Sequence, residues 1–287
     1  MKNKHLEFYF LLLCFCSLMI SCSDNEPDVP KTETFNVNGV SFTMVKVEGG
    51  TFLMGETAEE DTAFSYYNKP SPHLETVADF SIGQTEVTQA LWQAVMGENP
   101  SHFSGKNGYS EDLQRPVEFV SWRECKEFIT KLNELTGKEF RLPFEAEWEY
   151  AARGGNKSHS YRFAGSDSID DVAWYAYNWF SNYTNNISEL EDYDSLAETN
   201  CVALKAPNEL GLYDMCGNVW EWCEDLWGSY PFGLYEGTWM VIRGGSYHNK
   251  PEFCTVAYHG GGAYLTKGSG SILLTNRSST IGLRLAL

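Results

Sequence analysis

Positive charge is scarce in this sequence. Its 287 residues include 21 Lys and Arg against 39 Asp and Glu, which gives a formal net charge of −18 at pH 7. Binding to nucleic acid depends on clustered cations that neutralise phosphates, so the composition argues against a nucleic-acid partner. The surplus of carboxylates is instead compatible with binding of hard cations such as calcium.

The sequence also lacks an apolar run long enough to form a membrane-spanning helix. Its most apolar stretch, Phe8 to Ile20, follows Lys2 and Lys4 and ends at Ser21-Cys22. A short apolar run after positive charge is typical of a signal peptide. We therefore expect residues 1–21 to be a lipoprotein signal peptide and Cys22 to be lipidated. A plain secretory signal followed by an incidental cysteine is the alternative.

Few apolar residues follow Cys22. The segment from Ser23 to Thr34 is acidic and contains proline, so we expect residues 22–41 to be the lipidated cysteine and a flexible tether. The acidic start resembles a surface-export signal of Bacteroidetes lipoproteins. That resemblance implies a lipid anchor in the outer membrane and exposure at the cell surface.

The folded part has an odd number of cysteines. Of the eight cysteines, two lie in the predicted signal peptide and Cys22 takes lipid, which leaves Cys125, Cys201, Cys216, Cys223 and Cys254. An exported protein can form disulfides. Because five is odd, at least one of these thiols stays free unless it pairs outside the chain.

Regular periodicity is confined to the first half of the chain. The patterns predict helices from Thr88 to Gly97, from a capping box at Ser121–Glu124 to Gly137, and from about Phe144 to Arg153, with short strands in Val45–Gly55 and near Thr76–Ile82. After Gly155 the sequence is rich in Gly, Asn, Asp, Tyr and Trp and has no long predicted element. Such extended loops need metals, disulfides or aromatic packing to be ordered.

Segments in a fixed order carry a family resemblance. They are EGGTFLMG (48–55), RLPFEAEWEYAARG (141–154), PNELGLYDMCGNVWEW (207–222), RGGSY (243–247) and GLR (282–284). Together they resemble the formylglycine-generating enzyme (sulfatase-modifying factor) family over residues 42–287. The resemblance implies one loop-rich α+β domain, related to C-type lectins, with bound calcium. It also implies an oxidase that converts a cysteine of a client sulfatase to formylglycine, using oxygen and a copper ion held by two cysteine thiolates.

The resemblance implies two calcium positions. In the first, the side chains of Asp214 and Glu221 and the carbonyls of Gly217 and Val219 are the ligands; alternatively, the two carboxylates only hydrogen-bond a tight loop. The second, weaker position is formed by Asn178 and Asp194 with the carbonyls of Trp179 and Leu196. The segment between Asn178 and Asp194 is longer than in the family, which leaves this position open.

One of the two copper ligands is missing. Counted from Ser246, the two cysteine positions of the family fall on Asn249 and Cys254. Asparagine has no thiolate, so a copper site of the family type is not expected. A site formed by Cys254 with His248 or His259 is chemically allowed. From the family resemblance we instead expect a Cys223–Cys254 disulfide, which would stabilise the fold by roughly 2–4 kcal/mol.

The missing cysteine leads to several functional hypotheses. The first is a non-catalytic module that binds a peptide, protein or glycan through Tyr247, His248, Tyr258, His259 and Tyr264. The second is a formylglycine-generating oxidase of altered mechanism. A diversified binding surface and a structural role in the cell envelope are further alternatives, which the sequence does not distinguish.

Overall fold

The computed structural model describes residues 30–55, 72–178, 197–226, 240–261 and 276–287. The predicted signal peptide, Cys22 and the tether up to residue 29 lie outside these residues, as do Trp179, Asp194, Leu196 and Tyr264. Within the described residues, no helix combines the length and the apolar character needed to cross a membrane.

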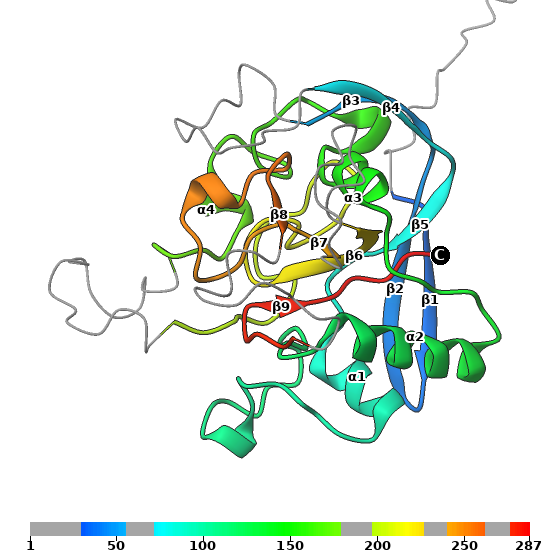
Figure 1. Cartoon of the computed structure of the whole chain (residues 1–287), viewed down its shortest axis with the longest axis vertical. Coiled ribbons are helices and arrows are strands. Elements are labelled where there is room, and N and C mark those ends of the chain that lie inside the picture. Colours follow the sequence, from blue (N-terminus) through cyan, green and yellow to red (C-terminus); the bar gives the residue numbers. More distant parts are fainter. Residues whose placement is uncertain (1–29, 56–71, 179–196, 227–239, 262–275) are drawn as a thin grey trace, which may run out of the picture.

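The architecture is α+β, as the resemblance predicted, and the described residues form three small sheets (Figure 1). The sheets have the strand orders β1-β2-β5, β3-β4 and β8-β7-β6-β9. The strands are β1 (Thr32–Val37), β2 (Val40–Val47), β3 (Gly50–Met54), β4 (His73–Val77), β5 (Phe80–Gly83), β6 (Trp220–Leu226), β7 (Met240–Arg243), β8 (His259–Gly261) and β9 (Ile281–Gly282). The α-helices are α1 (Gln89–Met96), α2 (Trp122–Thr136), α3 (Glu145–Ala152) and α4 (Ile169–Val172).

The predicted helix ends are confirmed by their caps. Thr88 Oγ1 accepts a hydrogen bond from Leu91 N at the start of α1, and Ser121 and Glu124 form the predicted capping box of α2. Gly97 and Gly137 end these helices in the left-handed conformation, which glycine adopts without steric cost.

The predicted boundary between tether and domain, at residue 42, is wrong because the folded part begins earlier. Residues 32–37 form β1, which pairs antiparallel with β2, and Phe35 of β1 packs edge-on against Phe140. The fold therefore includes part of the segment that was expected to be flexible. The signal was present in the sequence. Asn38-Gly39 is a two-residue hairpin turn with positive φ at both residues, and Phe35 and Val37 alternate with polar neighbours.

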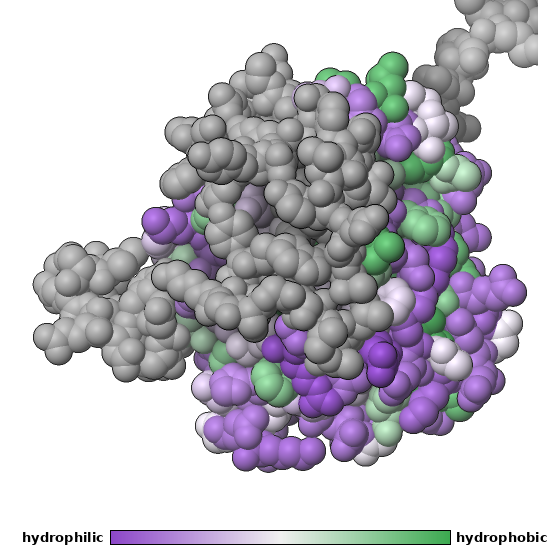
Figure 2. Space-filling view, in the orientation of Figure 1, coloured by the Kyte–Doolittle hydropathy of each residue, from purple (hydrophilic) through white to green (hydrophobic). Residues whose placement is uncertain are grey.

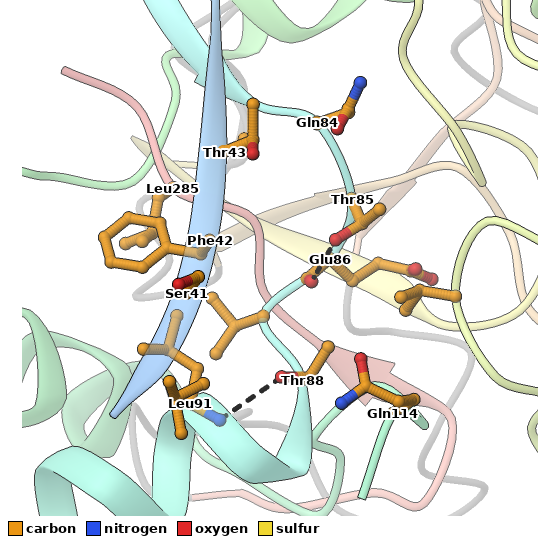
Figure 3. Close-up of a pocket in the computed structure, with 14 residues that line it drawn as sticks. Ser41, Phe42, Thr43, Gln84, Thr85, Glu86, Thr88, Leu91, Gln114 and Leu285 are labelled. Carbon is orange, nitrogen blue, oxygen red and sulfur yellow. Dashed lines mark hydrogen bonds between the residues drawn. The ribbon is translucent and has the colours of Figure 1, made fainter. Parts of the chain in front are cut away.

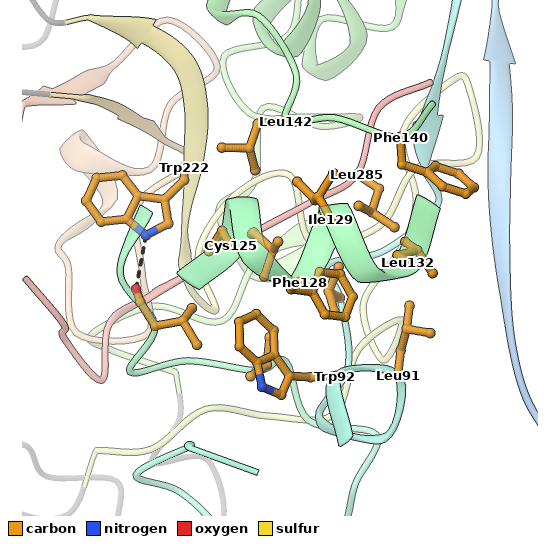
Figure 4. Close-up of a cluster of buried hydrophobic side chains, with 14 of the residues drawn as sticks. Leu91, Trp92, Cys125, Phe128, Ile129, Leu132, Phe140, Leu142, Trp222 and Leu285 are labelled. Atoms are coloured by element: carbon orange, nitrogen blue, oxygen red, sulfur yellow. Dashed lines mark hydrogen bonds between the residues drawn. The ribbon is translucent and has the colours of Figure 1, made fainter. Parts of the chain in front are cut away.

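Within the described residues, two large apolar clusters and a small third one, formed by Phe103, Ala197 and Tyr247, make up the core. The first joins α1 and α2 to the β1–β2 hairpin and to β6; there Trp92 stacks on Phe128 at 4.8 Å, and Trp222 Nε1 donates to Val120 O (Figure 4). The second packs α3 against β5, β7 and the loops that follow Gly155. On the face in Figure 2, the described surface is mostly hydrophilic, in keeping with the net charge.

Buried ion pairs help to order the loop-rich half. Arg243 on β7 pairs with Glu149 and Glu145 of α3, and Arg284 pairs with Glu221 of β6. All of these side chains are almost completely buried. Each pair therefore links segments far apart in the sequence, a role that the sequence analysis assigned to metals, disulfides or aromatic packing.

Candidate functional site

The loop after β7 brings the predicted catalytic positions together around one serine. Gly244 and Gly245 both have positive φ and lead into Ser246, which is fully buried. Ser246 Oγ donates to Asn249 Oδ1 at 2.6 Å, and Asn249 N donates to Ser246 O at 2.9 Å. The Cys254 thiol donates to the same Ser246 carbonyl over 4.0 Å. Asn249 and Cys254 thus both contact Ser246.

These residues do not fit a two-thiolate copper site. Asn249 offers an amide oxygen, a poor ligand for Cu(I), and that oxygen already accepts the Ser246 hydroxyl. Burial raises the pKa of the Cys254 thiol well above its usual value, which favours the protonated form that does not bind copper. A Cβ added to Gly245 would lie 2.5 Å from Cys254 Sγ, so the thiol is closely packed beneath the turn.

The predicted Cys223–Cys254 disulfide is wrong. All five cysteines of the described residues have free thiols. Cys254 lies beneath the Gly245–Ser246 turn, and the thiol that influences its pKa is Cys216. Cys223 lies on β6, where the charged groups that act on it are Glu145, Arg243 and Asp225. The two cysteines therefore face different surroundings.

The predicted ligand-binding residues are not equally accessible. Tyr247 is only 4% exposed and packs edge-on against Phe103, so it supports the loop from below rather than presenting a contact surface. Tyr258 is half-buried between Trp220 and Phe253. His248 is exposed. His259 lies in β8, and its side chain is outside the described part of the structure, as is the whole of Tyr264.

The expected calcium loop has one unsatisfied oxygen. Asp214 adopts a positive φ and is 3% exposed; its Oδ2 accepts a hydrogen bond from Ala203 N at 2.7 Å, while its Oδ1 has no partner. Burial raises the pKa of Asp214 to about 6. The turn approaches its surroundings closely at Gly217, where a Cβ would overlap the Trp174 carbonyl oxygen. Asp214 therefore fits a role as a cation ligand.

The other carboxylate of the expected set is already engaged. Glu221 accepts hydrogen bonds from Arg284 Nη2 at 2.7 Å, from Arg284 Nε at 2.9 and 3.0 Å, and from Trp148 Nε1 at 2.6 Å. These bonds occupy both oxygens. Glu221 thus corresponds to the alternative considered above, in which the carboxylate holds the loop together.

The second calcium position can be assessed only at Asn178. Its Oδ1 accepts from Tyr175 N at 3.0 Å, and its Nδ2 donates to Ala173 O at 2.7 Å, so the amide closes a local turn. Across the described segments, no three His, Cys, Asp or Glu side chains form a group able to hold a metal. Any cation there would need backbone carbonyls and water beside its side-chain ligands.

Glu86 was missed by the sequence analysis. It is 2% exposed, and neither of its carboxylate oxygens has a hydrogen-bond partner. Burial, and next the negative charge of Asp214, raise its pKa well above the usual value. No motif or periodicity marks this residue, because it belongs to the irregular Gly83–Thr88 segment that meets the Asp214 loop only in the folded protein.

The fold and these motifs define a sulfatase-modifying factor domain. The sulfatase-modifying factor enzyme 1-like domain matches residues 30–271, and the chain belongs to this family. It is 31% identical to "Chaperone protein LppX" of Paenibacillus barcinonensis, over 88% of this chain and 91% of that protein. It is 34% identical to the formylglycine-generating enzyme of Streptomyces coelicolor, over 71% and 69%. A solved structure titled "Treponema denticola variable protein 1" is similar with a TM-score of 0.69 and 29% identity, covering 90% of this chain and 99% of that one.

Proposed function

We propose that this chain is a lipid-anchored surface protein whose formylglycine-generating-enzyme-like domain binds another molecule and does not oxidise cysteine. The observation that carries the proposal is Asn249, whose side chain is bonded to Ser246 where the family enzymes have a copper-binding thiolate. The buried, protonated state favoured for Cys254 supports it.

A protein is the ligand class that we favour. A relative that matches 88% of this chain is named a chaperone, and a chaperone acts on another protein. Among the candidates whose side chains the structure describes, His248 is exposed, two positions beyond Ser246. We therefore place the contact surface around His248 and Asn249.

Photo-crosslinking tests that placement. A photoreactive amino acid replaces His248 in one variant and Glu127, on the exposed side of α2, in a control. In intact cells, the first variant is expected to crosslink to a defined envelope protein and the second is not. Equal crosslinking from both positions would contradict the placement.

The alternative function is the oxidase, favoured by the 34% identity to the Streptomyces coelicolor enzyme. Titration with Cu(I) against a competing chelator distinguishes the two. The natural chain is expected to bind Cu(I) weakly, and Asn249→Cys to gain affinity. Tight binding by the natural chain, or no gain in the variant, would contradict the role given to Asn249.

The membrane anchor rests on Cys22 and is tested separately. Cells supplied with a labelled fatty acid are expected to label the natural chain but not Cys22→Ser. Equal labelling of both chains would exclude Cys22 as the lipidated residue.

A further inference from the structure

Lysines line a pocket at the point where the described chain begins. The pocket has a volume of about 310 Å³, and ligand sites in proteins have volumes from about 300 to 1,000 Å³. Its charged lining residues are Lys31, Lys46, Glu48 and Lys157. Three of these four side chains are cations, although acidic residues outnumber basic ones by 39 to 21 in the whole chain. The charge of this lysine pocket is therefore opposite in sign to that of the protein.

The fold brings these lysines together from two segments that are far apart in the sequence. Lys46 is exposed on β2, and Lys157 ends a short 3-10 helix, Gly155–Lys157, that follows α3. Asn156 of this helix donates to the Gly49 carbonyl at 3.1 Å and accepts from the Tyr150 hydroxyl at 2.8 Å. These bonds hold the helix against the turn that follows β2, so the lysine pocket is part of the folded structure.

The lining of the lysine pocket combines an excess of positive charge with an apolar wall. Glu48 already accepts a hydrogen bond from Lys31 Nζ at 3.1 Å. The four charged groups sum to +2, and Val45 and Leu210 add apolar surface that is almost completely buried. Lysine binds phosphate as a compact point charge. The lining thus suits a phosphate group that carries an organic substituent.

A second cavity does not share this lining. It has a volume of about 190 Å³ and lies between β2 and the segment from Gln84 to Thr88 (Figure 3). Among the described residues that line it, Glu86 alone is charged, and the others are apolar or uncharged polar side chains such as Thr43 and Gln114. The gathering of lysines is therefore particular to the lysine pocket.

The lysine pocket lies close to the proposed lipid anchor. Pro30 lines the pocket and packs against Gly211, where a Cβ would lie 2.9 Å from Pro30 Cγ. Pro30 is eight positions after Cys22, and a chain of that length spans at most about 28 Å. An anchor at Cys22 therefore keeps the pocket within that distance of the membrane, where lipid headgroups supply phosphates.

We propose that the lysine pocket binds the phosphate of an anionic lipid headgroup and so sets the face that the anchored domain turns toward the membrane. An anionic membrane repels the acidic remainder of the protein, whereas each lysine near its surface favours binding by about fivefold. The location of the ligand rests on the lipid anchor of the proposed function. The chemistry of the pocket does not.

Vesicle binding by a chain without lipid tests the lysine pocket separately from the anchor. The chain from residue 22 onward, carrying Cys22→Ser, is sedimented at low ionic strength with vesicles of phosphatidylcholine alone or mixed with phosphatidylglycerol. It is expected to bind the mixed vesicles only, and Lys46→Gln and Lys157→Gln are each expected to bind them about fivefold more weakly. Lys131→Gln, which removes an exposed lysine on α2, is the matched control and is expected to bind like the unchanged chain.

Two further measurements distinguish the sources of phosphate and check the fold. Calorimetry with inorganic phosphate and with glycerol phosphate is expected to show much weaker binding than the vesicles do. All three lysine variants are expected to melt with the unchanged chain, since none of these lysines is buried. Binding of soluble phosphate without binding to vesicles would overturn the proposal, as would equal weakening by Lys131→Gln or no preference for phosphatidylglycerol. These outcomes hold whether or not Cys22 is lipidated in cells, which the labelling experiment decides.

Discussion

The buried Arg284–Glu221 pair supports the site loop, and removing its guanidinium should be severely destabilising. Arg284→Met keeps much of the side-chain volume but leaves Glu221 buried and unpaired. Breaking a buried pair in this way costs about 3–5 kcal/mol. The carbonyls of Gly83 and Tyr213 each lose a donor as well, at about 1–3 kcal/mol apiece when they stay dry. The total approaches the stability of a whole domain, about 5–15 kcal/mol.

Arg141→Met provides the matched control. Arg141 also holds a carboxylate with two hydrogen bonds, to Glu147 at 2.6 and 2.7 Å, but its side chain is 29% exposed. Solvent screens this pair, so its loss should cost about 1 kcal/mol.

Urea unfolding followed by tryptophan fluorescence at pH 7, with calcium present, measures both variants. Arg284→Met is expected to lose several times more unfolding free energy than Arg141→Met. Adding Glu221→Gln to Arg284→Met should recover part of the loss, because it removes the stranded charge. Equal losses in the two single variants would refute the reasoning.

Three further predictions concern the same region. Folding raises the pKa of Asp214 to about 6, so the native state binds more protons than the unfolded state. The calcium-free chain should therefore lose stability as pH rises from about 4 to 6. Melting curves in EDTA should show a weaker pH dependence of stability in Asp214→Asn than in the natural chain. Gly217→Ala should destabilise far more than Gly97→Ala, since both have positive φ but only the first Cβ meets backbone, and equal melting temperatures would contradict this. The pKa of half-exposed Cys201 is raised to about 11, so this thiol should react slowly with a thiol reagent in the native protein. In urea, all five thiols of the described residues should react. Fewer reactive thiols in urea would indicate a disulfide and contradict the free thiols described above.

Local patterns predicted the helices because their determinants are local. The cap at Thr88 and the capping box at Ser121 each depend on residues three positions apart, which a sequence displays directly. Likewise, the family spacing from Ser246 picked out Asn249 and Cys254, and both of these residues contact Ser246 in the structure. The start of the domain was misplaced because the acidic composition of the tether outweighed the Asn38-Gly39 hairpin turn.

The remaining features depend on contacts between distant segments. The segment of Glu86 meets the Asp214 loop where Tyr213 N donates to Gln84 O, and Arg284 donates to the Gly83 carbonyl; no local pattern records such contacts. The disulfide was mispredicted for the same reason. Pairing was carried over from other family members, whereas in the fold Cys254 packs beneath the Gly245 turn and both thiols are free.

Oxidation of a client peptide tests the central claim most directly. The purified chain, loaded with copper, is incubated in air with a peptide that carries the Cys-x-Pro-x-Arg sulfatase motif, beside the Streptomyces coelicolor formylglycine-generating enzyme as positive control. Mass spectrometry then reads the conversion of the peptide cysteine to the aldehyde. With Asn249 in place of a thiolate and Cys254 buried, the chain is expected to form no aldehyde while the control enzyme converts the peptide. Aldehyde formed by this chain above the level of copper alone would contradict the account.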